Sequence, residues 1–439
     1  MVGLLFQGTA AAQLFHWIFY PLTAGAVYLC ARRYYGPRTA LWAACFFIFT
    51  PAVFAQSGYP YVDLSLAFFI FLSVYAFLAA RESGDSKMYA LAGLFCGGAM
   101  GVKFLGLGCL LILFPLVFWE SRFNLKKSFL FLGAAVLAGG AWYAKSWILA
   151  GNPVYPLFHG FFGGHGWAVQ MDEGAGMGKN PAAFLFFPWN ITMRPNAFGG
   201  QTLGALFLLL TPALLLERRE IRPVSRCLAL FTFGYTAFLF TQSQQARFFI
   251  AVTPFLSIAA AVGFARATAG GRLLRGVASG ITAIILMLHL GIFVYRLRDV
   301  WPVVLGRQPA QAWLAEHERS FRGFDYLRNH VSADATVLNA AEVRYFYAPQ
   351  NLRITHWPQA MVEFHKQGVS AEKYLQRHGF DYLWVSNTPE PAIAAYLEKK
   401  GYVPVFHYDF TEKPDIFWNV IYKKPFSAQS LLPEQEGGL

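Results

Sequence analysis

Charged residues are scarce in this chain. Asp, Glu, Lys and Arg make up 14% of its 439 residues, whereas an average soluble domain contains about 25%. Apolar residues account for 56% and aromatic residues for 18%. This composition indicates a polytopic membrane protein rather than a soluble one.

Cysteine motifs and a leader pattern are also missing. The five cysteines lie in or beside apolar runs, and no two have CxxC spacing. The spacing therefore indicates neither a disulfide framework nor a zinc site, and favours small core residues. The first residues lack the basic segment that opens a cleavable signal peptide.

Positive charge, in contrast, is in excess, with a formal net charge of +12. The basic residues form short clusters between apolar runs and do not build one basic face, so they indicate membrane topology and no nucleic-acid partner. Runs of about 17–25 apolar residues can cross a bilayer. We expect about ten spans, at 11–31, 39–55, 62–80, 88–102, 105–119, 128–149, 201–216, 226–241, 247–265 and 277–296.

The distribution of Lys and Arg predicts which loops are cytoplasmic, because basic residues are retained on that side. One set of alternate loops is rich in them: Arg32, Arg33, Arg38, Arg81, Lys87, Arg122, Lys126, Lys127, Arg218, Arg219, Arg222, Arg226, Arg266, Arg272 and Arg275. The opposite loops hold only Lys103, Lys179, Arg194 and Arg247 before the tail. The first set is predicted to be cytoplasmic. The N-terminus, the 150–200 loop and the C-terminal tail are predicted to be extracytoplasmic.

The pattern changes after about residue 298. Helical stretches such as "SAEKYLQRHG" and "EPAIAAYLEKKG" alternate with short β-rich runs such as "ATVLNA" and "FDYLWVSN". We therefore expect a helical membrane domain over 1–297, a small α/β domain over 298–425 and a flexible tail over 426–439.

Polar residues gather at the predicted outer surface. Asp63 opens an apolar run, Lys103 lies in "GVKF", Lys145 is near the end of another span, and Arg247 follows "TQSQQA". A lone Lys or Arg at this depth often snorkels to the headgroups, but a short acid cannot reach far. One carboxylate with several cations would suit a lipid-linked phosphate, since cations hold the phosphate and the acid handles a proton or developing positive charge.

The long outer loop is rich in Gly and aromatic residues, as ligand-covering loops often are. His159, His165, Asp172 and Glu173 lie in it, but their spacing fits no zinc or calcium pattern. We assign no metal ligands and no certain cofactor, and leave a divalent metal open.

Several stretches together resemble a known family. "LCARRYYGPRTALWAACFFIFTPAVFAQSGYPYVDLSLAFFIF", "LAGLFCGGAMGVKFLGLGCLLILFP", "WILAGNPVYPLF", "FPWNITMRPNAFGG" and "QQARFFIAVTPFLSIAAAVGFA" resemble GT-C membrane glycosyltransferases, specifically polyprenyl-phosphate-dependent enzymes related to protein O-mannosyltransferases and aminoarabinose transferases. The resemblance covers residues 10 to 300. It implies a GT-C-like fold and sugar transfer from a lipid-linked donor to a glycan, lipid or protein acceptor outside the cytoplasm.

The resemblance also implies roles for three residues. Asp63 matches the acid before the span that follows the second outer loop, Lys103 matches a basic residue of "TK"-like turns, and Arg247 matches the Arg of "RY/RF" segments that meet the carrier phosphate. The family normally begins with a further span and an outer loop carrying an acidic pair. We therefore expect codons upstream of Met1 to encode both, and expect this chain alone to be nearly inactive. Otherwise Asp172 and Glu173 are the remaining candidate acids.

The leading hypothesis is thus a multi-pass glycosyltransferase of the cell (inner) membrane, in contact with membrane lipids. A transporter would explain the spans, but transporters usually place charges near mid-membrane and show repeated halves. A non-catalytic scaffold displaying the tail domain is the other alternative, and retained lipid-phosphate binding without transfer would favour it.

The first prediction concerns topology. A reporter fused after Lys424 should be active only as an exported protein, because the basic loops place the tail outside. A fusion after Asp85, in a predicted cytoplasmic loop, provides the opposite control. Cytoplasmic activity of the Lys424 fusion would overturn both the topology and the outer site.

Overall fold

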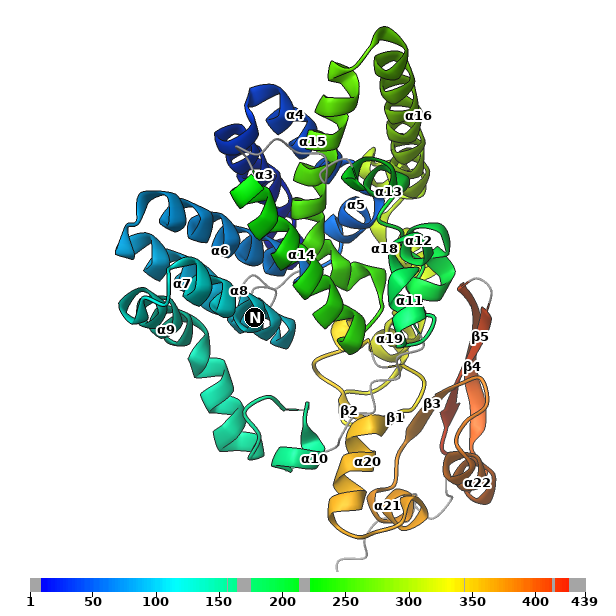
Figure 1. Ribbon diagram of the computed structural model, residues 1–439. Coiled ribbons are helices and arrows are strands. Elements are labelled where there is room, and N and C mark those ends of the chain that lie inside the picture. Colours follow the sequence, from blue (N-terminus) through cyan, green and yellow to red (C-terminus); the bar gives the residue numbers. More distant parts are fainter. Residues whose placement is uncertain are drawn as a thin grey trace, which may run out of the picture. The chain divides into compact units, whose positions relative to one another are not determined.

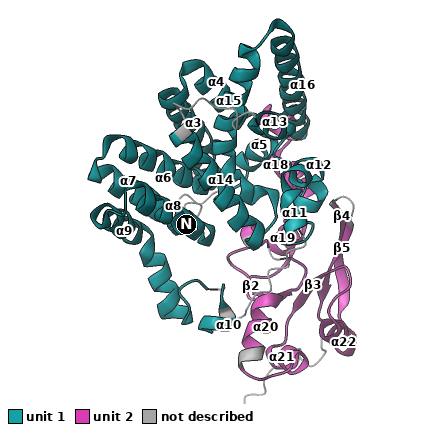
Figure 2. Ribbon diagram, in the orientation of Figure 1, with its two compact units in different colours: residues 1–299 teal, residues 300–439 magenta. Residues whose placement is uncertain are grey.

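The computed structural model describes residues 9–155, 157–163, 175–212, 222–342, 344–412 and 415–425. The chain divides into two compact units, Met1–Asp299 and Val300–Leu439 (Figure 2). The first unit is helical, and the second contains a five-stranded sheet. The predicted fold class, a helical membrane protein with a small C-terminal α/β part, is confirmed.

The helices of the first unit follow the apolar segments of the sequence (Figure 1). They are α2 (Thr9–Trp17), α3 (Phe19–Tyr35), α4 (Pro37–Ile48), α5 (Pro51–Ser57), α6 (Asp63–Ser83), α7 (Ser86–Val102), α8 (Leu107–Glu120), α9 (Leu125–Ala150), α10 (His159–Phe162), α11 (Pro181–Leu185), α12 (Phe187–Met193), α13 (Ala205–Leu210), α14 (Arg222–Gln242), α15 (Thr253–Ala269) and α16 (Arg272–Leu297). Short 3₁₀ helices join some of them, including η1 (Phe104–Gly106), η2 (Pro195–Phe198) and η4 (Ala246–Val252).

The helix lengths of the described residues account for six or seven of the about ten expected spans. Among the described residues, six helices are long and apolar enough to cross a membrane: Ala11–Tyr35, Asp63–Ser83, Leu125–Ala150, Pro223–Gln242, Ala246–Ala269 and Arg272–Leu297. A seventh is reached if α4 and α5, bent by 61°, form one broken span.

Chain breaks explain part of the difference. Helix α7 has 17 residues and ends at Lys103, where the backbone becomes extended. Pro51 begins α5 after an extended Thr50, since proline cannot continue the hydrogen bonds of a helix. Within 201–216 the structure describes α13 (Ala205–Leu210) and residues up to 212, and the remainder of that predicted span lies outside the described residues.

Helix α6 is uninterrupted and has defined ends. It begins at Asp63, whose negative charge in the first turn suits the positive end of the helix dipole. It ends at Gly84, which takes a left-handed conformation with φ of 70° and donates its N–H to the Ala80 carbonyl. Asp85 then caps α7 by accepting a hydrogen bond from the Lys87 N–H.

Helices α7 and α9 lie side by side and pack through glycines (Figure 1). A Cβ added at Gly93 would meet the Phe131 carbonyl oxygen at 2.1 Å, and one at Gly97 would meet the Ala135 carbonyl oxygen at 2.3 Å. From α9, a Cβ at Gly139 would meet the Gly97 carbonyl oxygen at 2.5 Å. The small residues therefore let the two backbones approach closely, as small-residue spacing does in lipid.

The second unit is built around one mixed sheet with the strand order β2-β1-β3-β5-β4. Strand β1 pairs in parallel with β2 and β3, and β5 pairs antiparallel with β3 and β4. The elements are α17 (Trp301–Val304), α18 (Ala310–His317), α19 (Phe321–His330), β1 (Thr336–Asn339), η5 (Tyr345–Tyr347), β2 (Arg353–His356), α20 (Trp357–Lys366), α21 (Ala371–His378), β3 (Tyr382–Ser386), α22 (Pro391–Lys400), β4 (Val403–Glu412) and β5 (Asp415–Lys423).

The glycine contacts give a stability prediction. Gly97→Leu should lower the stability of the protein in detergent by about 1–3 kcal/mol, because the added side chain forces α7 away from α9. Gly133→Leu is the matched control, since a Cβ at Gly133 meets nothing within 4 Å. Thermal unfolding of the purified proteins measures both. Equal midpoints for the two variants would show that the close approach contributes nothing.

Candidate functional site

Asp63 forms a buried ion pair at the start of α6. Its side chain is 4% exposed, and its Oδ1 accepts a hydrogen bond from Lys103 Nζ at 3.0 Å. A buried carboxylate without a partner costs several kcal/mol, so the contact with Lys103 offsets much of the cost of placing this acid inside the protein. Two of the predicted site residues are thus in direct contact.

Lys103 reaches Asp63 because the helix stops at that residue. Lys103 follows the last residue of α7 and has extended backbone angles, and η1 begins directly after it. The return of the chain is tight, since a Cβ added at Gly106 would meet the Ala99 carbonyl oxygen at 2.1 Å. The "GVKF" break therefore directs the lysine side chain toward the first turn of α6.

Arg247 lies beside this pair on η4. Both cations lie over the aromatic ring of Phe248. Lys103 Nζ is 3.9 Å and Arg247 Cζ is 4.8 Å from the ring centroid. The two cations are therefore no more than about 9 Å apart. Arg247 also lies 5.2 Å from the centroid of Tyr61. Its buried Nε has no hydrogen-bond partner, and within the described part of the chain no carboxylate lies within ion-pair distance of it.

Two further polar residues belong to this region and were missed by the sequence analysis. His16 is 2% exposed and lies near Asp63 and the Gln56 backbone, and neither of its ring nitrogens makes a hydrogen bond of ordinary geometry. Gln56, also 2% exposed, has an unpartnered Oε1. Helix α2, which carries His16, contacts both α5 and α6. A lone histidine within the apolar run "AAQLFHWIFY" is a signal that could have identified His16.

Buried polar atoms are nearly always hydrogen-bonded in folded proteins. Unpartnered atoms on Arg247, His16 and Gln56 therefore mark a polar region with capacity to bind a ligand. The Asp63 carboxylate is already paired with Lys103, whereas the Arg247 guanidinium has no carboxylate partner among the described residues. Arg247 can therefore bind an anionic oxygen group close to Asp63 while the Asp63–Lys103 pair stays intact.

The structure does not bring Lys145 to this cluster. Lys145 is exposed on α9, and its Nζ lies 4.9 Å from the Trp142 ring centroid. Across the residues that the structure describes, it makes no ion pair with Asp63. The separation follows from the helix, because residues three apart share one helix face and Lys145 therefore covers Trp142.

The candidate acids Asp172 and Glu173, and His165, lie outside the described residues, as does the side chain of His159. The described residues contain no group of three or more His, Cys, Asp or Glu side chains suited to a metal ion.

The "TQSQQA" segment ties the described end of the outer loop to the site. Gln244 accepts a hydrogen bond from the Met177 N–H at 3.0 Å and donates one to the Gly178 carbonyl at 2.7 Å. Gly176, with φ of 121°, packs so closely on Gln244 that an added Cβ would lie 2.2 Å from its Oε1. Gln244, which binds the outer loop, is thus only three residues before Arg247 in the chain.

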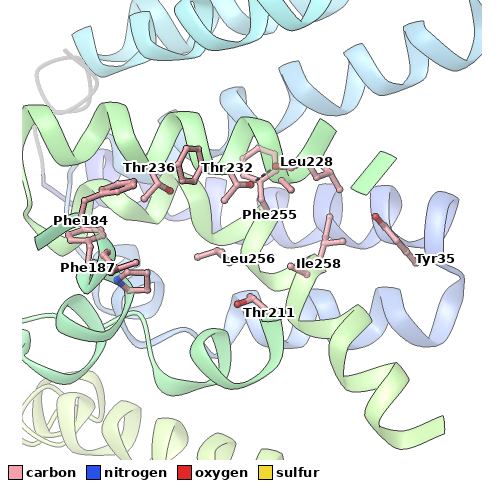
Figure 3. A pocket seen from close by; sticks show the side chains of 15 residues that line it. Tyr35, Phe184, Phe187, Thr211, Leu228, Thr232, Thr236, Phe255, Leu256 and Ile258 are labelled. Atoms are coloured by element: carbon pink, nitrogen blue, oxygen red, sulfur yellow. Dashed lines mark hydrogen bonds between the residues drawn. The ribbon is translucent and has the colours of Figure 1, made fainter. Parts of the chain in front are cut away.

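An apolar groove of about 400 Å³ runs along α14 and α15 (Figure 3). Phe184 and Phe187 lie at one end, and Tyr35 lies at the other, with Thr232 and Thr236 along one side. The Tyr35 hydroxyl is held by a hydrogen bond with the Ser225 hydroxyl, and the two oxygens are 2.8 Å apart. The lining suits a long hydrocarbon chain, since nearly all of its side chains are apolar or aromatic.

This architecture, apolar helices with a polar cluster at one end of α6, defines a multi-pass membrane protein. A family model described as dolichyl-phosphate-mannose-protein mannosyltransferase matches residues 7–167. The crystal structure of ArnT from Cupriavidus metallidurans bound to undecaprenyl phosphate aligns with a TM-score of 0.55 and 16% identity, covering 94% of this chain and 84% of that one. Its apo form aligns with a TM-score of 0.57 and 15% identity, covering 93% and 83%.

Relatives found by sequence are also glycosyltransferases, and they align over a shorter region. An undecaprenyl phosphate-alpha-4-amino-4-deoxy-L-arabinose arabinosyl transferase from Pseudomonas aeruginosa strain UCBPP-PA14 is 30% identical over 130 residues, which is 28% of this chain and 23% of that protein. The same protein from Pseudomonas paraeruginosa matches at 30% over the same shares. The alignments thus span about a quarter of these relatives. Together the comparisons confirm the resemblance to GT-C polyprenyl-phosphate glycosyltransferases that the sequence indicated.

The ion pair gives the next prediction. Lys103→Met should destabilise the protein by about 3 kcal/mol, because it leaves the Asp63 carboxylate buried without a counter-charge. Adding Asp63→Asn to Lys103→Met should restore most of that loss. Unfolding in detergent measures all variants, with Lys145→Met as the exposed-lysine control. If Lys103→Met unfolded like the wild type, the pair would not be holding the start of α6.

Proposed function

We propose that this protein transfers a sugar from a polyprenyl-phosphate carrier to a glycan, lipid or protein acceptor on the extracytoplasmic side of the membrane. The observation that carries the proposal is the Asp63–Lys103 pair with the unpaired Arg247 beside it, at one end of the helix bundle. The GT-C fold and the protein mannosyltransferase match support the reaction class.

Arg247 binds the carrier phosphate in this proposal. A guanidinium can make two parallel hydrogen bonds to phosphate oxygens, and that of Arg247 has no carboxylate partner among the described residues. Lys103 already donates to Asp63, so its main role is to keep that carboxylate charged rather than to hold the phosphate. The carrier chain then occupies the apolar groove that begins at Phe184 and Phe187.

Asp63 acts on the reacting sugar. In transfer, the bond between the anomeric carbon and the phosphate oxygen breaks, and the phosphate leaves with the electron pair. The acceptor oxygen forms the new bond and loses its proton. The Asp63 carboxylate stabilises the positive charge that develops on the sugar ring or takes the acceptor proton. Asp172 and Glu173 are the remaining candidates for a second acid.

The sidedness and domain roles are part of the proposal. The Lys and Arg distribution favours an inner-membrane protein whose Asp63 end and C-terminal α/β domain both face away from the cytoplasm. That domain, proposed to span 298–425, would lie on the side where the acceptor arrives.

The test separates carrier binding from transfer. Arg247→Ala should weaken undecaprenyl phosphate binding by about 10- to 100-fold, because a charge-assisted contact is lost. Asp63→Asn should keep that binding but abolish sugar transfer, since it preserves shape and removes charge. Binding is measured by native mass spectrometry of the detergent-solubilised protein, and transfer with a radiolabelled polyprenyl-phosphate sugar.

Arg194→Ala is the control, because Arg194 is an exposed arginine of the predicted outer surface that contacts Met177 rather than Asp63. Carrier binding by the wild type with no transfer would favour the non-catalytic scaffold. Near-normal turnover by Asp63→Asn in an active protein would make Asp63 an interfacial residue only.

A further inference from the structure

A second cavity, lined by charged residues, lies at the opposite end of α6 from Asp63. Its volume is about 910 Å³. It is formed where α3, α6 and α8 end and α14 begins. Its lining comprises Arg33, Tyr34, Leu78, Arg81, Glu82, Trp119, Glu120, Arg122, Pro223, Val224 and Arg226.

The cavity carries an excess of positive charge. Two of its four arginines are paired, with Arg33 Nη2 2.7 Å from Glu82 and Arg81 Nε 2.6 Å from Glu120. Arg122 and Arg226 have no ion-pair partner among the residues that the structure describes, and both are exposed. Two guanidinium groups are thus available for an anion from outside the protein, with two further arginines already oriented by glutamates.

The turn between α8 and α9 places Arg122 at this cavity. Arg122 and Phe123 both have left-handed backbones, with φ of 56° and 61°. Such angles are uncommon for residues with side chains and two in succession are rarer still. The Phe123 N–H donates to the Phe118 carbonyl at 2.9 Å, which holds the turn closed. This turn, with its uncommon backbone angles, is therefore what places Arg122 at the lining of the cavity.

The depth of the cavity suits a membrane surface. Helix α6 has 21 residues, and at 1.5 Å per residue it spans about 30 Å, the thickness of the hydrocarbon core. Asp63 at one end and Glu82 at the other therefore lie at opposite membrane surfaces. Trp119 lines the cavity and is 62% exposed, and aromatic residues of this kind favour the headgroup region.

We propose that this cavity binds the phosphate headgroup of an anionic phospholipid from the cytoplasmic leaflet. Basic pockets between spanning helices on that side recognise such headgroups. Arg122 and Arg226 contact the phosphate, and Leu78, Trp119 and Val224 contact the glycerol and upper acyl carbons. The site does not depend on the proposed sugar transfer, and it shares no lining residue with the apolar groove.

The test measures retention of dioleoyl phosphatidylglycerol by the purified protein, using native mass spectrometry across a lipid titration. The double variant Arg122→Gln with Arg226→Gln should bind it about 30-fold more weakly, because each arginine near the surface contributes about fivefold. Each single variant should lose about fivefold, which keeps the test decisive if the double variant unfolds. Dioleoyl phosphatidylcholine should bind weakly to all forms.

The matched control is Arg38→Gln with Arg272→Gln. It removes two exposed arginines from predicted cytoplasmic positions outside the cavity, and it should retain phosphatidylglycerol like the wild type. Equal losses in the cavity and control variants would refute a specific site and indicate general surface charge. Competition by millimolar glycerol phosphate as strong as that by phosphatidylglycerol would overturn the lipid assignment in favour of a soluble phosphate.

Discussion

The buried ion pair between Asp63 and Lys103 is the constraint from which the site follows. In a medium of low dielectric constant neither charge can stay unpaired cheaply, so the first turn of α6 must remain against the break between α7 and α8. That contact also satisfies the only carboxylate seen beside Arg247 in the described region, and leaves the guanidinium facing two aromatic rings. One pairing thus sets both the position of the acid and the availability of the arginine.

Much of the membrane part could be predicted because its physics is local. Asp63 stands out in the sequence as a short acid before a long apolar run. Gly93 and Gly97 have the GxxxG spacing that is typical of closely packed helices, and the structure shows α9 as the partner. In the second unit, the stretches "ATVLNA" and "FDYLWVSN" contain β1 and β3. Short apolar runs bounded by turn residues predict strands, so these two strands could be recognised from the sequence.

What could not be predicted depends on distant partners. The sequence placed Lys103 among the cations for a phosphate, and that role stays a prediction. Nothing near Lys103 in the chain reveals that it donates a hydrogen bond to Asp63, forty residues earlier. Lys145 was grouped with the site by depth alone, although helix phase turns it toward Trp142. His16 was overlooked. Strand β2 has only four residues, which is too short for a sequence pattern, and it gains its strand conformation by pairing with β1.

Helix α6 also connects the charged groups at its two ends, Asp63 and the Arg81–Glu82 segment, over a length of about 30 Å. Because the helix is unbroken, Asp63 and the Arg81–Glu82 end cannot adjust their separation independently. A bilayer much thicker than this would draw one charged end into hydrocarbon unless the lipids thin around the protein, whereas a thinner one would require tilting. Helix α6 therefore favours a hydrocarbon thickness of about 30 Å, and the thickness of the surrounding lipid acts on both of its charged ends together.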